Sequence, residues 1–179
     1  MDWFGRSRSN DELRKAAYRA QLAIVSNPGH GAWTSAWSEP QGARRYGADT
    51  PDTPRLIAGP LLARSHKIDE ALGAVMDCTP PADLTDILLQ ARLALVPMLE
   101  LSPVWIAHLT SRLEDRGLSG EALKDALGMD MEFGGFLLEG WEHEDAAINA
   151  VIAAAPLLDQ VHQALVPHSR TDWLARATG

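Results

Sequence analysis

The sequence has almost no cysteine and no long uninterrupted apolar run. Its single cysteine, Cys78, excludes a disulfide bond within the chain and is typical of a reducing compartment. No apolar run reaches the roughly 20 residues that cross a membrane. The first residues, MDWFGRSRS, lack the apolar core of a secretory signal peptide. These absences predict a cytoplasmic protein without a membrane segment.

Nucleotide-binding fingerprints are missing as well. The segment NPGHGAW contains Gly29 and Gly31 but has no third glycine, no preceding strand and no following Lys-Ser or Lys-Thr pair. The dinucleotide-binding and phosphate-loop patterns both need these features. The sequence therefore predicts no cofactor of either class.

Residues that could bind a metal or act in catalysis are present without the partners they need. In EGWEHEDA, Glu139 and His143 are four residues apart, but Gly140 lies between them and the second histidine of a zinc-protease motif is missing. Cys78 precedes an expected helix start, where a thiolate is stabilised, yet no particular histidine is brought to it. His108 lies in an apolar helical pattern and is expected to pack. We therefore expect no catalytic residue and no metal site.

Charge is distributed unevenly along a chain whose net charge is −8. Residues 1–67 contain ten Lys or Arg and six Asp or Glu, residues 68–101 contain one and six, and residues 102–145 contain three and ten. A polyanion should approach the first third of the chain and be repelled by the middle. Nucleic acid is therefore a possible but disfavoured partner.

Apolar residues recur at helical spacing, and no stretch alternates as a strand does. A capping box at Ser9 and Glu12 predicts the start of the first helix. Pro60 and Pro97 are expected to kink or break later helices, and Ser102 is expected to cap a new one. The expected helical segments are 9–25, 53–77, 79–101, 102–117, 119–128, 143–167 and 169–177. We predict a single all-α domain over residues 1–179, with six to eight helices and a long Gly/Pro-rich loop over residues 26–54.

One segment is similar to a known family. Residues 112–140 read RLEDRGLSGEALKDALGMDMEFGGFLLEG and match at Gly117, Leu118, Ser119, Leu123, Leu127, Gly128, Leu137 and Gly140. This segment resembles the helix-turn-helix of Xre/Cro-type repressors, inside a unit expected over residues 102–166. The resemblance implies a recognition helix that lies in the major groove of DNA.

This segment departs from the family at positions that matter for DNA binding. Lys124 stands where two helices need a small residue to meet, and Gly134 stands where the recognition helix needs Ile or Val. None of the positions that would contact DNA carries Arg, Lys, Asn or Gln, the types that read bases; these positions are Gly120, Met131, Glu132, Phe133, Gly135 and Phe136. Phe133, Phe136 and Trp141 suit a protein partner if they are exposed, and the core if they are not.

The loop over residues 26–54 is longer than the roughly 12–15 residues usual for an unstructured connection. Trp33 and Trp37 are four residues apart, which places both indoles on one side of a helical turn. Two interpretations stay open. Either the indoles pin the loop to the helical body, or they form a contact surface with His30, Arg44, Arg45 and Tyr46.

Three functions follow from these patterns. The first is a non-enzymatic regulatory or inhibitory protein that binds another protein, with a homodimer also open. Its predicted contact residues are Trp33, Trp37, Arg44, Arg45, Phe133, Phe136 and Trp141. The second is an Xre-type DNA-binding regulator that uses basic residues of the first third for phosphate contacts. The third is a ligand-binding protein or enzyme with a pocket under the 26–54 loop.

Overall fold

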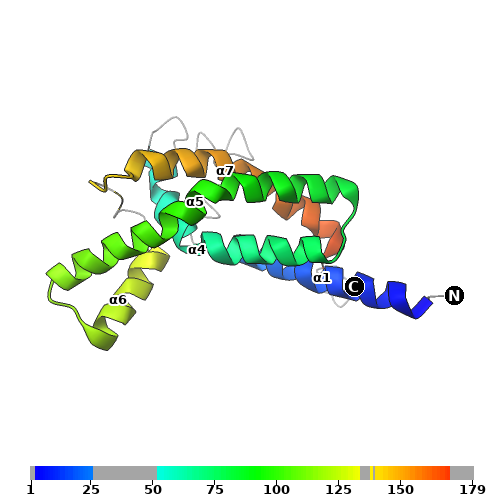
Figure 1. Cartoon of the computed structure of the whole chain (residues 1–179), viewed down its shortest axis with the longest axis horizontal. Helices are drawn as coiled ribbons and strands as arrows, with labels where there is room; N and C mark the ends of the chain where they lie inside the picture. Colours follow the sequence, from blue (N-terminus) through cyan, green and yellow to red (C-terminus); the bar gives the residue numbers. More distant parts are fainter. Residues whose placement is uncertain (1–2, 26–51, 134–137, 139, 170–179) are drawn as a thin grey trace, which may run out of the picture.

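The structure is a computed structural model that describes residues 3–25, 52–133, 138 and 140–169, and these residues are predominantly helical (Figure 1). The helices are α1 (Trp3–Val25), α4 (Asp52–Asp77), α5 (Ala82–Asp115), α6 (Gly120–Phe133) and α7 (Glu144–Leu165), followed by the 3-10 turn η2 (Val166–His168). No strand occurs in these ranges, which confirms the all-α prediction there. Within the same ranges there are five α-helices, fewer than the predicted six to eight.

The helices surround one apolar core. α5 packs along α7 on one side and along α4 on the other, and α1 contacts both α4 and α7. Figure 1 shows α5 and α7 running in opposite directions. The expected apolar face of the first helix is confirmed, because Ala17, Ala20 and Ile24 are fully buried and Leu13 packs against them. The face predicted for residues 84–95 is confirmed in the same way by Leu84, Leu88, Ala91 and Leu95.

Two predicted helix boundaries inside α5 are wrong. α5 continues through Pro97 and Pro103, and Ser102 is a buried interior residue rather than an N-cap. A proline removes one N–H and bends a helix, but packing on both sides of it can hold the turns together. Here Leu95, Met98 and Trp105 are buried on the same face before and after the prolines. α5 changes direction between its two halves in Figure 1. α4 is likewise continuous through Pro60.

The predicted start of α1 and the predicted end of α6 are also wrong. α1 begins at Trp3, so Ser9 and Glu12 lie inside the helix and form no terminal capping box. α6 continues through Gly128 to Phe133 because a glycine in a helix costs only about 1 kcal/mol relative to alanine. The expected stop at Gly117 is confirmed. Its φ of +84° is a left-handed conformation that ends α5.

α6 and the C-terminal part of α5 form a hairpin that projects from the remaining helices (Figure 1). Gly117 N donates to the carbonyl of Glu114 at 2.8 Å, and Leu118 N donates to the carbonyl of Leu113 at 3.2 Å. These two bonds close the helix end before the chain turns into α6. We call residues 106–128 the acidic hairpin, after its four exposed carboxylates Glu114, Asp115, Glu121 and Asp125; Arg112, Arg116 and Lys124 leave it a net charge of −1.

Candidate functional site

The structure describes only part of the predicted contact set. Phe133 is the last residue of α6, and nothing is assigned to its side chain. Trp141 is described in full. The other predicted contact residues lie outside the described residues; they are Trp33, Trp37, Arg44, Arg45 and Phe136.

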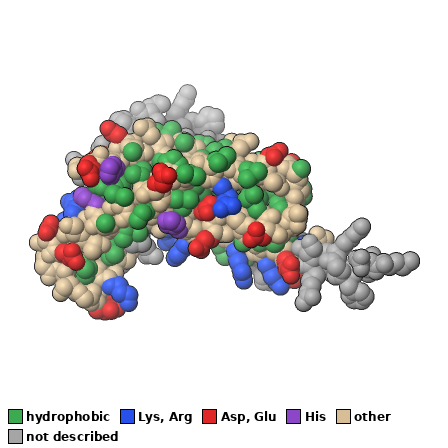
Figure 2. Space-filling model, in the orientation of Figure 1, with side chains coloured by type: hydrophobic (Ala, Val, Ile, Leu, Met, Phe, Trp, Pro, Cys, Tyr) green, Lys and Arg blue, Asp and Glu red, His purple; other side chains and the backbone are tan. Residues whose placement is uncertain are grey.

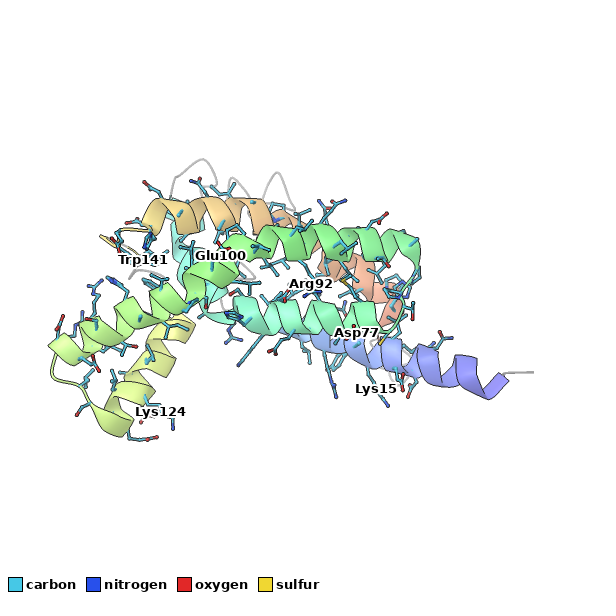
Figure 3. The ribbon with its side chains drawn as sticks, viewed as in Figure 1. Lys15, Asp77, Arg92, Glu100, Lys124 and Trp141 are labelled. Atoms are coloured by element: carbon cyan, nitrogen blue, oxygen red, sulfur yellow. The ribbon has the colours of Figure 1, made fainter. Side chains whose placement is uncertain are left out.

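Trp141 is a core residue, which corrects its prediction as a contact residue. Its side chain is only 4% exposed. Gly140 has a φ of +78°, and Trp141 N donates to the carbonyl of Leu138 at 2.9 Å, so a tight turn precedes α7. This turn places the indole of Trp141 against that of Trp105, with 5.0 Å between ring centroids. Figure 3 shows Trp141 on the inner side of the turn, facing the helices.

Two histidines complete this aromatic cluster. His108 stacks on Trp105 at 5.8 Å between ring centroids, and His143 meets the edge of Trp141 at 5.3 Å. Burial lowers the pKa of His108, Arg112 lowers it further, and Glu142 opposes the shift. A neutral imidazole at pH 7 packs here as an aromatic ring. The cluster joins α5 to the start of α7 and is a structural feature.

The remaining chemically reactive residues do not assemble into a site. Cys78 Sγ donates a weak hydrogen bond to the carbonyl of Ala74 at 3.3 Å. Burial raises the pKa of the Cys78 thiol, and Glu12 and Asp77 raise it further, so the thiolate form is disfavoured. Among the described residues, no three His, Cys, Asp or Glu side chains come together as metal ligands.

A salt bridge fixes α4 against α5. Arg92 Nε donates to Asp69 Oδ1 at 2.7 Å, and Nη2 donates to Oδ2 at 3.0 Å. The hydrogen bonds that Arg92 donates to Asp69 raise the pKa of Arg92, so its guanidinium stays charged. A Cβ added to Gly73 would lie 3.7 Å from the guanidinium, an ordinary van der Waals contact, so an alanine would fit beside this salt bridge. In Figure 3, Arg92 points from α5 toward α4.

The outward side of α5 carries four large apolar residues. Leu89, Leu93, Val96 and Val104 are 43%, 70%, 43% and 41% exposed. Their spacing of four, three and eight residues places them on one side of the helix, because a helix turns every 3.6 residues, and Val104 lies beyond Pro97 and Pro103. We call these four side chains the outer strip. Figure 2 shows apolar side chains over the area of α5 and α7, and most Lys and Arg side chains along the lower edge.

Charge is scarce along the outer strip. From residue 86 to residue 104, the exposed charged residues of α5 are Asp86 and Glu100, both acidic. Arg92 lies between them in sequence but is held by Asp69 on the α4 side. α7 shows a similar outer surface, with Ile152 48% exposed and no charged residue from 146 to 158. The outer strip is therefore an apolar surface bordered by carboxylates.

α5 is long and apolar enough to cross a membrane by length and composition alone. The same property belongs to a helix whose inner face fills a protein core. Nine residues of α5 are buried in this way; they are Leu84, Leu88, Ala91, Leu95, Met98, Ser102, Trp105, Leu109 and Leu113.

Comparison with protein-family models, with curated proteins and with solved structures finds no match to the chain.

Sequence reasoning missed the outer strip, although a signal for it exists. From residue 87 to residue 111 the only charged side chains are Arg92 and Glu100. A helix with so few charges is apolar on both sides, whereas a surface helix normally has one polar side. The helical pattern of Leu84, Leu88 and Leu95 predicted the buried face of this helix. No role was predicted for the apolar residues of the outer strip.

Proposed function

We propose that the protein is a cytoplasmic, non-enzymatic regulatory or inhibitory module that acts by binding another protein through the outer strip. The observation that carries this proposal is the exposed line of Leu89, Leu93, Val96 and Val104. Single exposed apolar residues are ordinary on a protein surface, whereas several of them on one side of a helix are typical of an interaction site. Covering the strip removes apolar surface from water, which stabilises a complex by about 25 cal/mol per Å² of apolar area buried.

The proposal changes the expected contact surface but keeps the expected function class. The acidic hairpin gives the DNA-binding alternative less support, since exposed Glu121 and Asp125 would face phosphates. Lys124 is paired with Glu121 at 3.1 Å. α6 also continues through Gly128, where a helix-turn-helix needs its turn. The pocket alternative rests on the 26–54 loop, most of which lies outside the described residues.

Site-specific photocrosslinking tests the proposal. A photoreactive amino acid replaces Leu93 on the outer strip in one variant and Leu22 on α1 in a matched control, where the native leucine is 44% exposed. Both variants are irradiated in cells of the native host. We expect protein adducts from position 93 and none from position 22, and we expect Val96→Gln to abolish them. Equal adducts at both positions, or none at position 93, would refute the proposal.

A further inference from the structure

The outer strip offers two exposed carboxylates, and the one cation near it, Arg92, is partly exposed and ion-paired with Asp69. Asp86 lies just before its first residue, and Glu100 lies between Val96 and Val104. The guanidinium of Arg92 is engaged by both carboxylate oxygens of Asp69. A partner that covers the strip therefore gains from cations at its own edges, and a partner with acidic edges is repelled.

Prolines interrupt the backbone hydrogen bonding of α5 and α7. A helix carbonyl normally accepts the N–H of the residue four positions later, and proline has no N–H. Pro97 therefore leaves the carbonyl of Leu93 without this donor, and Pro156 does the same to Ile152. Leu93 and Ile152 are the most exposed large apolar residues of α5 and α7 among those described. The pyrrolidine ring of each proline packs against that carbonyl, which leaves little room there for a partner's donor.

The shape of the surface selects a helix as the covering element. The strip runs from Leu89 to Val104, which is about 22 Å at 1.5 Å per residue. A sheet edge would be needed to bind an extended strand by backbone pairing, and the described residues contain no strand. A line of apolar side chains along a helix is matched by the apolar face of a second helix.

We infer that the occupant of the outer strip is an amphipathic helix of another protein, about four turns long, with Lys or Arg beside its apolar face. The inference rests on the proposed function. The apolar face of the partner covers Leu89, Leu93, Val96 and Val104. Its cations reach Asp86 and Glu100, which gives charge-assisted hydrogen bonds as well as apolar contact. A second copy of this chain that docked through its own outer strip would instead bring further carboxylates.

Fluorescence anisotropy with two synthetic peptides tests this inference. Each peptide has about five helical turns and the same leucine face, and the two differ only in carrying Lys or Glu beside it. We expect the full chain to bind the Lys peptide and to leave the Glu peptide free. Leu93→Gln should weaken binding at least tenfold, while Leu22→Gln, the matched change on α1, should leave it unchanged. The variant Asp86→Asn/Glu100→Gln should weaken binding and flatten its dependence on salt.

Each other outcome overturns the inference in a recognisable way. Equal binding of both peptides, weakened by Leu93→Gln, removes the charge preference but leaves the proposed function intact. Binding of the Lys peptide that Leu93→Gln does not change places the contact elsewhere, for example on the acidic hairpin. No binding of the Lys peptide also overturns the inference, and the crosslinking at position 93 then decides the proposed function separately.

Two further measurements separate other occupants of the strip. Sedimentation of the chain alone should show a monomer. A dimer that Leu93→Gln dissociates would instead identify a second copy of the chain as the occupant of the strip. Vesicles of phosphatidylcholine should not bind the chain; binding that Leu93→Gln abolishes would make a membrane the occupant. Circular dichroism of each variant confirms that it is folded before binding is compared.

Discussion

The inner and outer faces of α5 carry similar apolar residues at similar spacing, yet their burial is opposite. Leu88 and Leu95 are fully buried between α4 and α7, whereas Leu93, between them in sequence, is 70% exposed. Hydropathy therefore does not decide which side of this helix enters the core. The neighbouring helices decide it, and they cover one side only. The uncovered side retains the composition of a core, which is why it suits a partner.

The largest expected difference between the two faces concerns Trp105. Trp105→Ala removes an indole that is 1% exposed and contacts Trp141. We expect the free energy of unfolding to fall by about 3–5 kcal/mol, because the change loses buried area and leaves a cavity. Urea unfolding followed by circular dichroism measures this. A loss below about 1 kcal/mol would contradict the assignment of this face to the core.

A smaller effect is expected at the α4–α5 boundary, which separates the two faces. Asp69→Asn removes the charge that Arg92 contacts, and both side chains are partly exposed. We expect a loss of about 1 kcal/mol, reduced by high salt. The matched control is Asp11→Asn, which breaks a more exposed pair with Lys15 on α1. The control should change the free energy of unfolding by less than about 0.5 kcal/mol; an equal loss in both variants would contradict the special role of the boundary.

A weaker effect should appear on acidification. Burial lowers the pKa of His108 and of His162 below 6.5, with Arg112 adding to the shift at His108 and Glu142 and Asp159 opposing it. The unfolded chain then binds more protons than the folded chain, so stability is full above about pH 6.5 and falls as pH drops through that value. Thermal unfolding at about pH 7.5 and about pH 5 measures the slope. The variant His108→Gln/His162→Gln should have a shallower slope, and an unchanged slope would exclude these histidines as its cause.

The smallest expected effect is on the outer strip itself. Leu93→Gln should change the free energy of unfolding by less than about 0.5 kcal/mol, as should Leu22→Gln on α1, because both side chains are exposed. Chemical unfolding of the isolated chain tests both variants. A loss of about 2 kcal/mol at Leu93 alone would show that another part of the chain covers the strip. That result would show that both faces of α5 are covered within the chain.

The sequence predicted the helical class and the buried faces of α1 and α5, since Ala17, Leu88 and Leu95 recur at helical spacing. It failed at Ser102 and Gly128, because local capping and propensity terms of about 1 kcal/mol are smaller than the packing that carries a helix through them. Burial of Trp141 depends on a turn that brings it to Trp105, a contact between residues far apart in sequence. The outer strip could be predicted only as apolar, since its exposure depends on where other helices lie.

The acidic hairpin has a consequence for the speed of encounter. Its exposed carboxylates Glu114, Asp115, Glu121 and Asp125 lie beside three cations, Arg112, Arg116 and Lys124, on a hairpin that projects from the remaining helices (Figure 1). Fields from such charges extend over a screening length of about 8 Å at physiological salt, farther than any apolar contact. The four negative and three positive charges nearly cancel beyond this length, so the hairpin adds little to the attraction of the basic helix inferred above. The salt dependence of association would then report Asp86 and Glu100 rather than the hairpin.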